Sequence, residues 1–104
     1  MGTNAEHSNR PWEDFESGKV QWADFSKSEK TAIVRHYAPK IRFLALRLKN
    51  RLPQSIDLNE LISAGTLGLM ESLRKFSAKV GIRFETFSEN RIRGAMLDDL
   101  RKLD

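Results

Sequence analysis

Aromatic and basic residues are interleaved in the segment KVGIRFETFSENRIR, which spans residues 79–93. Phe84 and Phe87 lie three positions apart, and the basic residues around them are Lys79, Arg83, Arg91 and Arg93. Single-stranded nucleic acid is bound by a positive groove that holds the backbone and by aromatic rings on which unpaired bases stack. The segment therefore suggests non-covalent binding of a nucleic acid.

The same two phenylalanines also fit a helix that packs into a core. Phe84 shares helical spacing with the apolar positions Ile92, Ala95, Met96, Leu100 and Leu103, so we assign it to the buried stripe. Phe87 lies at the edge of that stripe, and both base stacking and core packing stay open for it. The opposite side of this helix carries Thr86, Asn90, Arg93, Leu97 and Arg101.

The sequence contains no pattern typical of an active site. It has no cysteine, which excludes a thiolate nucleophile, and His7 and His36 have no ligand or nucleophile pattern beside them. Asp98 and Asp99 are adjacent, so on a helix their side chains diverge by about 100° and cannot share a proton or a metal. The glycines of GTLGLM fall inside a predicted helix, which argues against a phosphate-binding loop. We expect neither enzymatic activity nor a cofactor.

Three long amphipathic helices are expected to position these residues. Ser26 and Glu29 form a capping-box pattern ahead of a helix from Lys27 to Arg51, in which Pro39 should cause a kink or break near Ala38. The second helix should run from Leu58 to about Phe76, and the third from about Glu85 to Leu103.

The predicted fold class is all-α, a compact bundle of about four helices. The fourth and shortest helix begins at Pro11, and Gly18 could close it. Its aromatic residues either pack onto the main body or pin the helix to something else. We expect residues 1–9 to form a disordered tail, residues 10–25 a short helix and linker, and residues 26–104 the main domain.

Basic residues are concentrated outside the first 24 residues. The chain has a net charge of +4, although its first 24 residues hold five acidic and two basic side chains. A basic run with no acidic residue inside it follows the proline of the first long helix: Lys40, Arg42, Arg47, Lys49 and Arg51. Such a run is either a solvated face or a surface for a polyanion or an acidic protein.

The middle helix carries an apolar spot on its outer face. Leu67 points away from the predicted buried stripe, and polar or flexible residues flank it: Glu60, Ser63, Met70 and Arg74. An apolar centre with a polar rim is typical of a protein-contact site. A second packing contact within the domain is the alternative.

Three patterns in this chain resemble region 2 of bacterial sigma factors, the RNA polymerase subunits that recognise and open promoters. The patterns are RHYAPKIRFLA, ELISAGTLGLM and FETFSENRIRGAMLDDLR, in that order. The RIRGAMLDDLR portion is similar to the flagellar or motility type. The later regions of such factors have no counterpart here, so the sequence looks like a fragment of a longer protein, and we expect it in the cytoplasm.

The resemblance implies two partners. The middle helix would dock on the clamp helices of the largest subunit of core RNA polymerase, through Asn59, Glu60, Ser63, Ala64, Thr66 and Met70. The apolar spot at Leu67 lies on the same outer face and adds Leu67 to this set. Housekeeping relatives carry an acidic and an amide side chain where this chain has Ala64 and Ser63. An anti-sigma factor is a further expected partner. The sequence has no apolar run long enough for a membrane span.

The resemblance also implies binding of the promoter −10 element, including bases flipped out of the non-template strand. The matching positions are Phe84, Thr86, Phe87, Asn90, Arg91, Arg93, Gly94 and Leu97, and charge adds Lys79 and Arg83. Housekeeping relatives carry a tryptophan pair where this chain has Asn90 and Arg91. Two alternatives remain: a helical module that binds polymerase or a regulator without DNA, and a duplex-reading helix-turn-helix protein.

Overall fold

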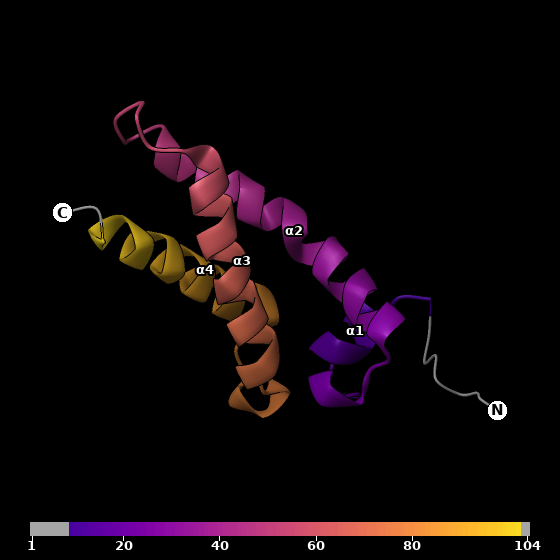
Figure 1. The fold of residues 1–104 in the computed structure, drawn as a ribbon. Coiled ribbons are helices and arrows are strands. Elements are labelled where there is room, and N and C mark those ends of the chain that lie inside the picture. The colour runs from indigo at the N-terminus through magenta and orange to yellow at the C-terminus, as the bar shows by residue number, and fades with distance from the viewer. Residues whose placement is uncertain (1–8, 103–104) are drawn as a thin grey trace.

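The computed structural model describes residues 9–102, apart from the side chain of Val80, and confirms an all-α fold (Figure 1). Its helices are α1 (Pro11–Glu16), α2 (Lys27–Lys49), α3 (Leu58–Lys75) and α4 (Phe84–Arg101). Two 3-10 turns, η2 (Trp22–Asp24) and η3 (Ala78–Val80), lie between them. Most of the predicted tail and the end of the last predicted helix, Leu103, lie outside the described residues.

Helix α2 begins with the predicted capping box and continues through its proline. The hydroxyl of Ser26 accepts from the amide of Glu29, and the Glu29 carboxylate accepts from the amide of Ser26. Of the kink or break predicted near Ala38, the break is wrong, because α2 is a single helix that contains Pro39. Pro39 deprives the carbonyl of Arg35 of its amide partner, but both residues are exposed, so water can supply the missing hydrogen bond.

The N-terminal helix packs onto the main body. Phe15 is buried, and its ring centroid lies 4.9 Å from that of Phe84. Trp12 stacks on His36 of α2 with centroids 4.3 Å apart. Gly18 follows α1 with a φ of +81°, a conformation that glycine adopts without steric cost. Residues 10–25 therefore share one core with the rest of the described chain.

Helix α3 packs against both α2 and α4, and two glycines allow its close approach to α4. A Cβ atom on Gly68 would lie 2.7 Å from the carbonyl oxygen of Arg91 and 2.9 Å from the Cα of Ile92. A Cβ atom on Gly65 would lie 2.5 Å from the Cε of Met96. Both glycines belong to the GTLGLM segment, which lies inside a helix as predicted.

Two glycine-to-alanine substitutions should change stability in opposite directions. Gly68→Ala places a methyl group against the backbone of α4 and should lower the free energy of unfolding by about 1–3 kcal/mol. Gly94→Ala meets no atom within 4 Å and should raise it by roughly 0.5–1 kcal/mol, because alanine is the better helix former. Urea denaturation measures both. Equal effects of the two substitutions would contradict the close packing of α3 on α4.

Candidate nucleic-acid interface

The outer face of α4 presents four of the predicted DNA-binding residues to solvent. Thr86, Asn90, Arg93 and Leu97 recur at spacings of three or four residues and are all exposed. The buried residues of the same helix are Phe84, Ser88, Ile92 and Met96. Gly94 is half-buried, and the position where its side chain would stand is open space. A ligand could therefore approach the α4 backbone closely at Gly94.

Phe84 lies inside the core, as predicted. It is 2% exposed, and its ring packs against Phe15, Tyr37 and Phe76, with centroids 4.8–5.1 Å away. A ring enclosed in this way has no face on which a base can stack. The resemblance implies a role in DNA binding for Phe84. Because the ring is buried, this role can only be indirect: Phe84 anchors the first turn of α4 to the core.

Phe87 is half-buried and lies between the core and the surface. Its ring centroid is 5.6 Å from that of Phe76 and 4.6 Å from the guanidinium carbon of Arg91, which lies over the ring. Arg91 also pairs with Glu71 of α3 at 3.2 Å. Lys75, and after it Arg91, lowers the pKa of the Glu71 carboxyl, which stays ionised at neutral pH. Arg91 must move before a base can use the ring face that it covers.

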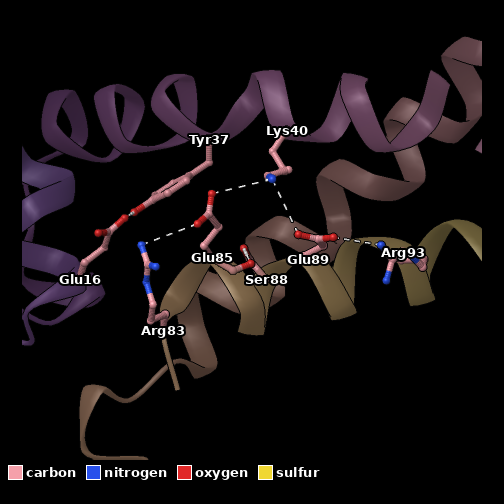
Figure 2. A network of polar contacts seen from close by, with 8 residues as sticks. All are labelled: Glu16, Tyr37, Lys40, Arg83, Glu85, Ser88, Glu89 and Arg93. Atoms are coloured by element: carbon pink, nitrogen blue, oxygen red, sulfur yellow. Dashed lines mark hydrogen bonds and ion pairs between the residues drawn. The ribbon is translucent and has the colours of Figure 1, made fainter. Parts of the chain in front are cut away.

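Carboxylates on α4 hold several of the cations near this face (Figure 2). The Lys40 ammonium lies 3.8 Å from Glu85 and 3.7 Å from Glu89. Glu89 also pairs with Arg93 at 3.0 Å, and Arg83 approaches Glu85 at 3.8 Å. All five side chains are at least partly exposed, so each pair contributes at most about 1 kcal/mol. A phosphate competes with weakly held carboxylates for these cations.

A hollow of about 590 Å³ lies between α1, α2 and the start of α4. Its lining mixes charges, since Glu13 and Glu16 of α1 face Lys40 and Arg83. The hydroxyl of Tyr37 donates to Glu16 (Figure 2). Burial, and after it this hydrogen bond, raises the pKa of Tyr37, so its hydroxyl stays protonated. The two partners lie 21 positions apart, and no sequence pattern links them.

The remaining predicted DNA-binding cations lie ahead of α4. Lys79 lies in η3 and Arg83 directly precedes α4, and both side chains are exposed. Gly81 separates them with a φ of +82°, which reverses the chain. The segment thus presents two exposed cations ahead of α4.

The outer face of α3 presents most of the predicted polymerase-binding residues. Leu67 is 71% exposed, and it lines a groove of about 470 Å³ between α3 and the end of α4. Asn59, Glu60 and Ser63 are exposed beside it. Two acidic residues of α4, Asp98 and Asp99, line the other side of this groove and were not predicted there. The groove is therefore apolar at its centre, and its rim carries four carboxylates and the ammonium group of Lys102.

Three predicted members of this face are less accessible than the others. Ala64 is only 8% exposed, and Met70 is half-buried against the core. The hydroxyl of Thr66 donates to the carbonyl of Ile62 at 2.8 Å, so its proton is already used within α3. Leu67 is thus the main apolar group that a partner can reach here.

Residues 9–102 contain neither a metal-ligand cluster nor a membrane-spanning helix. No three histidine, aspartate or glutamate side chains gather there in a way that could bind a metal ion. None of the helices in this part of the chain has the length and apolar character needed to cross a membrane.

Comparison with known proteins identifies the family. The model of the sigma-70 region 2 family matches residues 33–104. RNA polymerase sigma factor FliA of Pseudomonas aeruginosa is 40% identical over 79 residues, which are 76% of this chain and 32% of that protein. FliA of Escherichia coli K12 is 43% identical over 76 residues, or 73% of this chain and 32% of that protein.

A third relative is the RNA polymerase sigma-D factor of Bacillus subtilis, 36% identical over 84 residues, or 81% of this chain and 32% of that protein. This chain therefore spans about a third of the length of the curated relatives it matches. The similarity to FliA confirms the predicted flagellar type. The chain belongs to the sigma-70 region 2 family.

Proposed function

We propose that this chain is the part of a sigma factor that docks on core RNA polymerase and binds the −10 element of promoters. The observation that carries the proposal is the presence of two different exposed faces on one helical unit. The α3 face has Leu67 at its centre, and the α4 face runs from Thr86 to Leu97. Family membership supports the assignment of the first face to protein and the second to DNA.

On the DNA side, the proposed ligand is the non-template strand as it separates from its partner. Phe87 would stack on an unpaired base once Arg91 swings away from its ring, and the freed guanidinium would then pair with a phosphate. Asn90 and Arg91 can form hydrogen bonds and ion pairs, but they cannot replace a base in the stack as tryptophan can. Strand opening by this chain should therefore depend little on aromatic wedging.

On the protein side, the proposed partner is the pair of clamp helices in the largest polymerase subunit. Leu67 would be the apolar anchor, and Asn59, Glu60 and Ser63 would form the polar rim around it. An anti-sigma factor is a further proposed partner.

One observation favours a second candidate, a protein-interaction module that binds no DNA. Lys40, Arg91 and Arg93 are all paired with carboxylates of this chain, which lowers the positive potential near α4. A sufficiently strong set of such pairs would leave only the α3 face in use.

Binding to oligonucleotides and to core polymerase separates the two candidates. We expect the 104-residue chain to bind a single-stranded −10 oligonucleotide weakly at physiological salt and more tightly at low salt, because few phosphates are contacted. Core polymerase should strengthen this binding and the preference for the −10 sequence over a scrambled one. Fluorescence anisotropy across a salt series measures it. A chain that binds polymerase but no oligonucleotide at any salt concentration would be the interaction module instead.

A further inference from the structure

A second groove, between α2 and α4, is lined by basic and apolar side chains only. Its volume is about 210 Å³, and its lining residues are Leu44, Arg47, Leu48, Arg51, Arg93, Met96 and Leu97. It differs from the hollow beside α1, where carboxylates of α1 and α4 face the cations. No acidic residue lines this groove, although one of its three arginines, Arg93, is paired with Glu89 of the same helix.

Two of its arginines have no ion-pair partner in residues 9–102. Arg47 and Arg51 are exposed and take part in none of the ion pairs of this described part of the chain. Lys49, the cation between them in the sequence, instead donates to the carbonyl of Ile56 and so secures the turn after α2. Arg47 and Arg51 therefore keep their guanidinium donors available to a ligand.

The spacing of these arginines costs stability in the free chain. Arg47 and Arg51 are four residues apart in the sequence and line the same groove, where like charges repel each other. The helix dipole stabilises Arg47, which lies in the last turn of α2. It does not stabilise Arg51 in the same way, because Arg51 lies beyond the end of the helix. A bound anion would relieve this repulsion, and the folded chain supplies none in the groove.

Phe43 extends the same line of side chains and holds one of the arginines. It is 52% exposed, and the Arg47 guanidinium carbon lies 5.5 Å from its ring centroid, with the Lys40 ammonium at 5.8 Å. Cation–π contacts of this kind orient a cation without consuming its hydrogen-bond donors. Lys40 and Arg47 are therefore partly oriented before any ligand arrives.

We propose that this groove binds the phosphodiester backbone of a nucleic acid, as a second contact surface beside the outer face of α4. Guanidinium groups match the geometry of phosphate and bind it through two parallel hydrogen bonds. The groove shares Arg93 and Leu97 with the α4 face, so one DNA molecule can reach both. This inference rests on the proposed function only for the class of ligand, a nucleic acid. Binding in the groove requires neither a promoter sequence nor polymerase.

The test compares two charge-reversal pairs on the 104-residue chain with random-sequence DNA, both single-stranded and duplex. Arg47→Glu with Arg51→Glu alters the groove, and Arg35→Glu with Arg74→Glu is the matched control. Arg35 and Arg74 are also exposed and also lack ion pairs in the described residues, but they lie outside the groove. Both pairs change the net charge equally, so general electrostatic attraction falls by the same amount in each.

We expect the groove pair to weaken DNA binding at low salt about tenfold more than the control pair does. On duplex DNA, it should also lower the slope of log K against log salt concentration by the amount that about two phosphate contacts contribute. Arg47→Gln with Arg51→Gln should lower the slope similarly without introducing repulsion. Circular dichroism checks that each variant folds. A greater loss on duplex or on single-stranded DNA tells which form supplies the backbone, and either result supports the proposal.

Equal weakening by the groove pair and the control pair on both DNA forms would overturn the proposal, as would a wild-type chain that binds neither form at low salt. The proposed function fails by a different result, namely no preference for the −10 sequence and no association with polymerase. Random-sequence binding through the groove can survive that failure.

Discussion

Leu67→Asp is expected to abolish association of the chain with core RNA polymerase. Leu67 is 71% exposed at the centre of the α3 face, so in a docked complex it would be the side chain that loses most contact with water. Truncation of a central anchor typically costs 2 kcal/mol or more, and a buried carboxylate without a partner adds a desolvation penalty. The dissociation constant should therefore rise by at least roughly 30-fold, measured by biolayer interferometry with immobilised polymerase.

The matched control is Leu46→Asp, which changes a leucine of α2 that is 41% exposed. It introduces the same charge in a helix outside the α3 face, and binding should stay within about twofold of the wild type. Leu67 is a better probe than Met70, because Met70 packs against the core and its substitution would also change stability. Unchanged binding of the Leu67 variant, with folding intact, would remove the α3 face from the proposed docking surface.

The second large effect should separate the two phenylalanines at the start of α4. Phe84→Ala removes a buried ring from a cluster of four aromatic side chains and should lower the free energy of unfolding by about 3–5 kcal/mol. Phe87→Ala should cost less stability, because its ring is only half-buried. It should instead weaken single-stranded DNA binding by roughly 1–3 kcal/mol, with little change in salt slope. Thermal denaturation and fluorescence anisotropy measure the two quantities.

Arg91→Ala is the companion variant for this experiment. It removes one cation and uncovers the ring of Phe87, so the salt slope should fall by about one phosphate's worth while stacking stays possible. Should Phe87→Ala unfold the chain as Phe84→Ala does, Phe87 is a core residue and another group must carry the stacking role.

The ion pairs around α4 give the free chain a specific resting state. Glu89 is shared by Lys40 and Arg93, and Glu71 holds Arg91. These pairs are exposed enough to be weak and screened by salt, so they order the side chains without locking them. Arg47 and Arg51 lie beyond this set of pairs, and no carboxylate lines the groove between α2 and α4 to which they belong.

Local patterns in the sequence determined the fold class and most of the helix boundaries. The capping box at Ser26 and the apolar periodicities predicted helix starts that the structure reproduces to within one residue. The outward direction of Leu67 followed from helical geometry alone, because 100° per residue fixes which side chains share a face. The family, too, was carried by contiguous motifs.

Only the tertiary structure decided which of the basic residues are already paired and which groove is left open. The pairs Arg91–Glu71 and Lys40–Glu89 join different helices, and the contact of Tyr37 with Glu16 joins α2 to α1. No spacing rule reaches across such separations, since they depend on how the helices cross. Gly68 illustrates the reason: its missing side chain sets how close α3 comes to α4, and that distance fixes every contact between the two helices.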